Sequence, residues 1–254
     1  MYPIMFKIGN FPIYSYGVML SLAAIVALYL IVRFSEAYGV KKEDSFDLTL
    51  LVIISGILGA RLAWVLLNWN DYKGDLLQIL YIRQGGLAWH GALIGGILAG
   101  VWFARVKKLK FWKLADLTAP AIILGQAIGR LGCFLNGCCY GKLTRSWLGV
   151  QMNILDARGF RHPTQVYELL LDLAAFFFLL WWRKGNRKEG DLFLLMLIIA
   201  SFNRFLVEFW RESETIISVF SLAQLVSSAI ILVSLAFLGR LQKGSPGVGS
   251  RAKG

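Results

Sequence analysis

Charged residues are scarce in this chain of 254 residues, making up 17% of it against 57% hydrophobic residues. Soluble proteins carry roughly 25% charged and roughly 45–50% apolar residues. The mean hydropathy of +0.61 exceeds what one soluble core can bury, so the composition excludes a water-soluble enzyme. Histidine and cysteine are also scarce, with two and three residues, and no histidine lies near the cysteines in sequence to complete a zinc set.

The apolar residues are grouped in segments long enough to cross a bilayer. A spanning helix needs about 20 apolar residues. The segments of this kind are 14–33, 47–67, 87–104, 117–135, 166–182, 191–209 and 219–238. The sequence therefore predicts an all-α integral membrane protein with seven transmembrane helices.

The chain shows no internal repeat, no low-complexity linker and no stretch long enough for a second domain. We therefore predict one polytopic membrane domain over 1–254. Residues 241–254 are rich in Gly, Ser and Lys, which is typical of a disordered cytoplasmic tail. The first span lacks the basic start and the small-residue cleavage site of a signal peptide, and we expect it to remain in the mature protein.

The net charge of +12 first suggests an acidic partner or nucleic acid. Of the 27 basic residues, sixteen fall in the loops and tail on one side of the seven spans, eight fall on the other side, and three lie within spans. Cytoplasmic loops carry the excess of Lys and Arg. We therefore expect the N-terminus outside, the C-terminus in the cytoplasm, and no nucleic-acid partner.

Three arginines lie within the predicted spans, where a charge costs roughly 2.5–3.5 kcal/mol and indicates function by default. Arg130 and Arg204 both approach the outer leaflet, where a guanidinium suits a lipid phosphate. Glu208 follows Arg204 by four residues and lies within ion-pair reach on the same helical face. Arg61 either binds a substrate in the same way, or snorkels or pairs with a carboxylate.

The two histidines and three cysteines all fall on the predicted outer side. His90, at the start of the third span, can accept a proton near neutral pH, whereas His162 in a Pro-containing turn is more typical of a structural residue. We interpret the three cysteines, Cys133, Cys138 and Cys139, as small residues that pack in a crowded turn. A disulfide from Cys133 and a low-pKa thiol beside Arg130 remain alternatives.

Pairs of small residues four apart mark the second, third and fourth spans. Such pairs let membrane helices approach closely. They are Ser55 with Gly59, Gly91 with Gly95, Gly96 with Gly100, and Gly125 with Gly129. We therefore expect these three spans to be central in the helix packing.

Six segments in order give the chain a family resemblance. They are YGVML, GARLAWV, GGLAWHGALIGG, GRLGCFLNGCCYG, RHPTQVYE and NRFLVEFWRE, between about residues 10 and 238. This chain resembles the prolipoprotein diacylglyceryl transferases, and seven spans with the N-terminus outside also fit that family.

The resemblance implies an activity: transfer of a diacylglyceryl group from phosphatidylglycerol to the lipobox cysteine of exported lipoprotein precursors. The products are a thioether and glycerol phosphate. It also implies residence in the cytoplasmic (inner) membrane, with the active site toward the outer face. The family's important positions are matched here by Tyr16, His90, Arg130, Asn136, Gly141, Arg204 and Glu208.

Two residues depart from the family signature, which usually has Asn where this chain has Cys133 and Glu where it has Cys138. These replacements keep open a same-fold lipid-modifying enzyme with another acceptor. A transporter of anionic solutes, lined by the three arginines, is a further alternative.

The residue types suggest roles in a displacement of phosphate by sulfur. Arg130 and Arg204 suit the head group and the leaving phosphate, and His90 suits the base, with Tyr16 as an orienting hydroxyl. Glu208 would fix Arg204, while Asn136 and Gly141 would offer amide donors to the head group. No metal and no organic cofactor is expected, because phosphate leaves as a stable anion.

Overall fold

The computed structural model describes residues 2–81, 85–154, 157–185, 188–213, 215–217 and 220–243. The helices are α1 (Ser15–Phe34), α2 (Lys42–Leu67), α3 (Trp69–Tyr72), α4 (Trp89–Val106), α5 (Phe111–Asn136), α6 (Thr164–Trp182), α7 (Asp191–Val207) and α8 (Leu222–Lys243), with short 3-10 turns η1 (Ser35–Tyr38), η2 (Leu76–Leu80) and η4 (Glu208–Trp210). Of the predicted tail, residues 241–243 belong to α8, and residues 244–254 lie outside the described part.

Seven helices of the described chain are long and apolar enough to cross a membrane, which confirms the predicted number of spans. The largest difference at one helix end is at α5, which begins at Phe111 and not at 117. An apolar run marks only the part of a helix suited to lipid, and the helical backbone of α5 continues through Lys113 and Asp116. Hydropathy therefore locates a span better than it locates the helix ends.

Three antiparallel hairpins accompany the helices in the part of the chain that the structure describes, so the mainly helical class is confirmed but the chain is not purely helical. They pair β1 (Ile4–Ile8) with β2 (Phe11–Tyr14), β3 (Val150–Ile154) with β4 (Ala157–Arg161), and β5 (Thr215–Ile217) with β6 (Phe220–Ser221). A search for apolar segments of about 20 residues does not detect strands of two to five residues.

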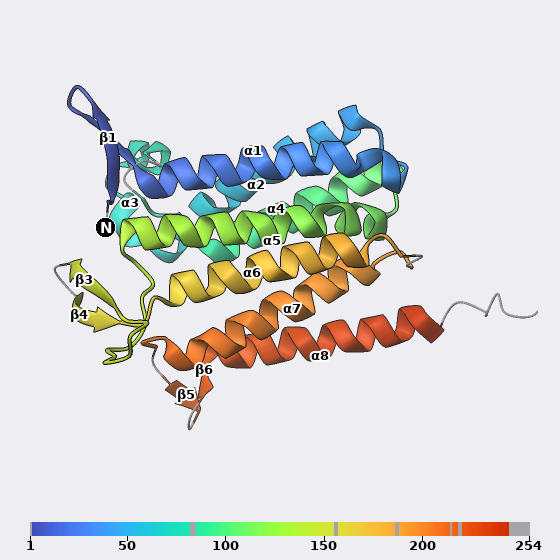
Figure 1. Ribbon diagram of the computed structural model, residues 1–254. Helices are drawn as coiled ribbons and strands as arrows, with labels where there is room; N and C mark the ends of the chain where they lie inside the picture. The colour runs from blue at the N-terminus through green and yellow to red at the C-terminus, as the bar shows by residue number, and fades with distance from the viewer. Residues whose placement is uncertain are drawn as a thin grey trace, which may run out of the picture. The chain divides into compact units, whose positions relative to one another are not determined.

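The described chain divides into two compact units. One comprises Met1–Ala27 and Thr118–Gly254, and the other comprises Leu28–Leu117. In the first unit α6, α7 and α8 lie side by side, and the three hairpins gather at the end where α5 finishes and where α6 and α8 begin (Figure 1). The ends of several helices meet there. The prediction of a single domain over 1–254 remains a prediction.

In the second unit, small residues allow α2 and α4 to pack backbone against backbone. A Cβ atom added at Gly59 would collide with the carbonyl oxygen of Gly91, and one added at Gly95 would collide with that of Ser55. The predicted close approach is confirmed for these pairs. At Gly125 and Gly129 a Cβ would meet nothing within 4 Å, so the prediction of close helix packing at that pair is wrong. Those glycines simply lie where space is open.

We expect Gly91→Ala to destabilise the protein by about 1–3 kcal/mol, because the added methyl group would overlap the backbone of Gly59 and force α2 and α4 apart. Thermal unfolding of the detergent-solubilised protein measures the effect. Gly100→Ala is the matched control, since the same methyl group on the same helix meets nothing within 4 Å. Equal unfolding temperatures of the two variants would contradict the packing role.

Candidate functional site

The candidate site in the first unit is built around the carboxylate of Glu168, which is 2% exposed near the start of α6. It forms ion pairs with two arginines from different helices: with Nε of Arg130 from α5, and with a terminal nitrogen of Arg204 from α7 at 3.0 Å. One buried carboxylate therefore fixes α5, α6 and α7 to one another. A buried charge is tolerated only when it is paired in this way.

Arg204 is also bound to a second carboxylate, as the sequence predicted. Its other terminal nitrogen lies 2.7 Å from Glu208, four residues later in the chain. The Ser221 hydroxyl donates to Glu208 at 2.9 Å. Both terminal nitrogens of Arg204 are thus engaged by carboxylates.

A capping box holds Ser221 in place at the start of α8. The Ser221 amide donates to the Gln224 side chain at 3.1 Å, and the Gln224 amide donates to the Ser221 hydroxyl at 3.3 Å. The sequence Ser-Leu-Ala-Gln has the spacing of this motif. Local sequence therefore delivers the hydroxyl that supports Glu208.

The guanidinium of Arg130 differs from that of Arg204 because its terminal N–H groups are not hydrogen-bonded to carboxylates of the described residues. Its Nε faces Glu168, and within the described chain no hydrogen bond engages its two terminal nitrogens. Its side chain is 21% exposed. These nitrogens form the fork that binds a phosphate or carboxylate through two parallel bonds.

Asp172 lies one helical turn beyond Glu168 and is fully buried. It accepts hydrogen bonds from the amide groups of Gln126 in α5 at 3.0 Å and Asn203 in α7 at 3.1 Å. The polar network therefore continues inward along α6, between α5 and α7.

Sequence reasoning missed both Glu168 and Asp172. The two carboxylates are four residues apart within the predicted fifth span. Placing a carboxylate in a span costs free energy, as placing an arginine there does. The signal was present, because residues spaced by four share a helical face.

The structure brings Tyr16 into the same unit as Arg130. Tyr16 lies in the first turn of α1 and is 42% exposed. Its ring lies over Gly132 of α5, where a Cβ would approach it to 3.3 Å. Arg130 and the three cysteines lie within electrostatic range of its hydroxyl.

Asn136 and Gly141 flank the turn after α5, but their contacts differ. Asn136 is half-buried and is the last residue of α5. The Gly141 amide donates to the His162 carbonyl oxygen at 2.9 Å, and a Cβ at Gly141 would collide with the Trp210 carbonyl oxygen. The amide of Gly141 is therefore occupied and not available to a head group, and glycine is needed for close packing.

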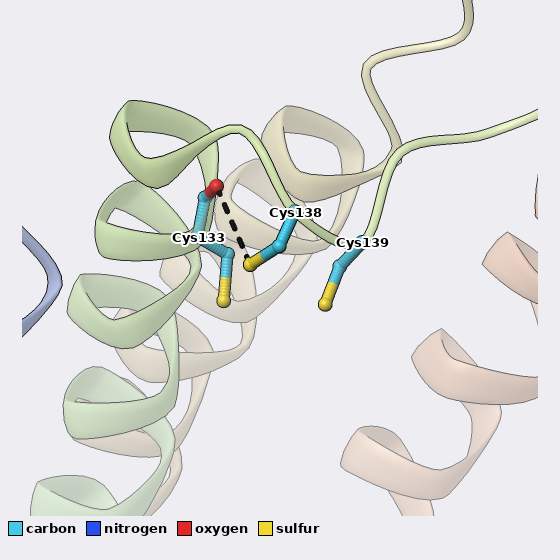
Figure 2. Close-up of side chains that lie close together, drawn as sticks. All are labelled: Cys133, Cys138 and Cys139. Atoms are coloured by element: carbon cyan, nitrogen blue, oxygen red, sulfur yellow. Dashed lines mark hydrogen bonds between the residues drawn. The ribbon is translucent and has the colours of Figure 1, made fainter. Parts of the chain in front are cut away.

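The three cysteines converge in this turn, with their sulfur atoms all within 4.8 Å of one another. Figure 2 shows Cys133 on the last turns of α5 and Cys138 and Cys139 on the loop that follows. All three are free thiols. Hydrogen bonding from Cys133 and Cys138, together with the positive charge of Arg211, holds the pKa of the Cys139 thiol below its usual value despite partial burial.

Arg61 lies in the second unit and has a different environment from the other two arginines. It is 6% exposed, and its three nitrogens donate to backbone carbonyl oxygens of Gln78, Ile79, Gly85 and Gly86 at 2.6–3.0 Å. Its guanidinium also lies over the Tyr72 ring. It does not snorkel and pairs with no carboxylate among the described residues; it fixes backbone carbonyls that follow α2.

The two histidines lie in different units and have different contacts. His90 lies at the start of α4 in the second unit, is exposed, and packs edge-on against Trp89. His162 lies in the first unit, where its Nδ1 lies 3.0 Å from the Tyr167 hydroxyl and its backbone pairs with that of Gly141. These contacts agree with the structural role expected for His162.

Comparison with known proteins identifies relatives over nearly the whole chain. The family model described as prolipoprotein diacylglyceryl transferase matches residues 3–240. A phosphatidylglycerol–prolipoprotein diacylglyceryl transferase of Bacillus mycoides is 40% identical over 240 residues, which are 91% of this chain and 89% of the relative. Proteins of the same name from Bacillus cereus and Bacillus cytotoxicus are 39% and 38% identical, over 91% of this chain and 89% and 88% of theirs. This chain belongs to the prolipoprotein diacylglyceryl transferase family.

Proposed function

We propose that this protein transfers a diacylglyceryl group from phosphatidylglycerol to the lipobox cysteine of a prolipoprotein, forming a thioether and releasing glycerol phosphate. The substrates are those in the names of relatives about 40% identical to it. Seven helices long enough to cross a membrane fit a lipid substrate.

The unengaged fork of Arg130 is the observation that carries the proposal. Glu168 holds this guanidinium by its Nε, so the terminal nitrogens are oriented before a lipid binds. Phosphate accepts two parallel bonds from such a fork. Arg204, with both terminal nitrogens on carboxylates, serves mainly to position Glu168 and adds positive charge to the site.

The reaction proposed here breaks one bond and forms one. The acceptor thiolate attacks the glycerol carbon that bears the phosphate, the C–S bond forms, and the C–O electron pair leaves on a phosphate oxygen. Negative charge grows on the phosphate in the transition state, and donors fixed in advance stabilise it. Tyr16 orients the phosphate or thiol, Asn136 supports the turn, and Arg61 acts as a positioning residue in its own unit.

We further propose His90 as the base that removes the thiol proton. A free cysteine has a pKa of about 8.5 and is mostly protonated at neutral pH. We expect His90→Gln to lower the transfer rate about 10²-fold at pH 7 and far less at pH 9, where the peptide thiol ionises unaided. Rates measured across this pH range test the assignment.

His162→Gln is the matched control for that profile. Because His162 contacts Tyr167 and is not the proposed base, its replacement should not give the recovery of activity at pH 9 that is expected for His90→Gln. A His90→Gln variant with most of its activity at pH 7 would assign proton removal to another group or to water.

We propose residence in the inner membrane, with the N-terminus and the active site outside and the C-terminus in the cytoplasm. Basic residues favour this orientation, and the three hairpins lie at the end of the first unit that it places outside (Figure 1). A protease-cleavable C-terminal tag should be resistant in spheroplasts and cleaved in inverted vesicles. The reverse pattern would refute this orientation.

The proposed reaction is tested with the purified protein, labelled phosphatidylglycerol and a lipobox peptide. A thioether-linked peptide, absent when serine replaces the peptide cysteine, supports the proposal. Lipid turnover without labelled peptide would instead indicate another acceptor. Anion uptake by protein-containing vesicles without any lipid chemistry would indicate a transporter.

A further inference from the structure

Three thiols, those of Cys133, Cys138 and Cys139, lie together where α5 ends. We propose that these cysteines bind a thiophilic metal ion, Zn²⁺, as three thiolates, with a fourth coordination position that takes the sulfur of the acceptor cysteine. The metal site stands on the geometry alone, and the role of the fourth position rests on the function proposed above.

The sulfur positions suit a tetrahedral ion. A Zn–S bond of about 2.3 Å places the sulfurs of one site about 3.8 Å apart, and the three sulfurs here already lie within 4.8 Å of one another. In Figure 2 the Cys133 and Cys139 sulfurs point the same way, with the Cys138 sulfur between them. Small side-chain rotations therefore bring all three onto one ion.

The backbone is arranged to bring these sulfurs together. Gly137 and Cys139 both have positive φ, 78° and 64°, and a non-glycine residue rarely adopts that conformation. Such a conformation persists where the surroundings impose it and points to function. The Cys138 carbonyl accepts from the Gln165 side chain at 2.5 Å, and the Cys139 carbonyl accepts from the Thr164 hydroxyl at 2.8 Å. The loop that carries two of the ligands is thus fixed to the start of α6.

The fourth coordination position is left for a ligand from outside. No further His, Cys, Asp or Glu of the described residues joins the group. Zinc sites with three protein ligands keep the fourth position for water or substrate, and thiolates select ions such as Zn²⁺ or Cu⁺.

The cluster lies close to the proposed phosphate site. Cys133 follows Arg130 by three residues on α5, which is about 4.5 Å along the helix axis, and Thr164 and Gln165 precede Glu168 by about one turn. Three thiolates and Zn²⁺ carry a net charge of −1, which the nearby Arg130 and Arg211 offset. A sulfur bound here would therefore lie beside the arginine that holds the phosphate.

Coordination supplies the nucleophile in its reactive form. When the acceptor S–H binds, the Zn–S bond would form and the proton would pass to water. The bound sulfur then forms the C–S bond as the C–O pair leaves on the phosphate, and the Zn²⁺ oxidation state does not change. A thiol bound to a metal ion is deprotonated.

The metal content of the full-length protein tests the site. Protein purified in detergent with a non-thiol reductant should hold about one Zn²⁺ per chain, as a specific three-thiolate site requires. Cys133→Ser, Cys138→Ser and Cys139→Ser should each lose most of this metal, while Leu143→Ser, which places a serine at an exposed position of the same loop, should keep it. Wild-type protein with three titratable thiols and no bound metal, or with two of the thiols in a disulfide, would overturn the inference.

Cobalt substitution of the wild-type protein tests the fourth position without relying on variants. Co²⁺ should give sulfur-to-metal charge-transfer bands, which a lipobox peptide should strengthen and its cysteine-to-serine analogue should not. Bands unchanged by both peptides would overturn the role for the acceptor sulfur. Lipid transfer by metal-free enzyme would refute the metal step and leave the proposed function standing, whereas metal binding without transfer would refute the function alone.

Discussion

Replacing Arg130 by alanine is expected to lower the rate of diacylglyceryl transfer by at least roughly 10²–10³-fold, the loss seen when one preorganised donor to a developing anion is removed. The change deletes the fork that Glu168 orients and leaves the negative charge of the departing phosphate unsupported. The initial rate of thioether formation on a lipobox peptide, from labelled phosphatidylglycerol, measures the effect.

Two further arginine variants sharpen this prediction. Arg145→Ala removes an exposed arginine from the loop after α5, and its rate should stay within a few-fold of the unchanged protein. Arg130→Lys keeps the charge but lacks the planar fork, so it should restore only part of the activity. Near-normal transfer by folded Arg130→Ala protein would exclude the proposed role.

Replacing Glu168 by glutamine is expected to destabilise the protein by about 3–5 kcal/mol, the usual cost of removing one partner from a buried ion pair. Glutamine keeps the shape of the side chain but not its charge, so Arg130 and Arg204 would lose their shared counter-ion. The free energy of unfolding in mixed detergent micelles measures the loss.

Glu212→Gln provides the matched control, because that carboxylate pairs with Arg161 but its side chain is 59% exposed, where ion pairs contribute little. It should change stability by less than about 1 kcal/mol. A Glu168→Gln variant as stable as Glu212→Gln would show that the two arginines do not depend on the carboxylate.

Some parts of the fold and the site were readable from the chain itself. Long apolar runs dictate spanning helices because lipid cannot satisfy a backbone amide outside a helix or a closed barrel. The pairing of Arg204 with Glu208 follows from their spacing of four on one helix. The close approach at Gly59 and Gly91 follows from the small residues that permit it.

Other features required the three-dimensional arrangement. Glu168 meets Arg130 and Arg204 although 38 and 36 residues separate them in sequence, and no helical or strand period relates such positions. The convergence of Cys133, Cys138 and Cys139 depends on positive φ at Gly137 and Cys139, which spacing does not specify.

The sequence by itself determined the seven spans, the family, and the arginines and cysteines available for chemistry. Only the tertiary structure decided that Arg61 donates to backbone carbonyls, that Arg204 is held by two carboxylates, and that Glu168 holds Arg130 by its Nε. The physical reason is that residue type and local period fix what a side chain can bind, while packing between helices decides which of those groups remain unpaired.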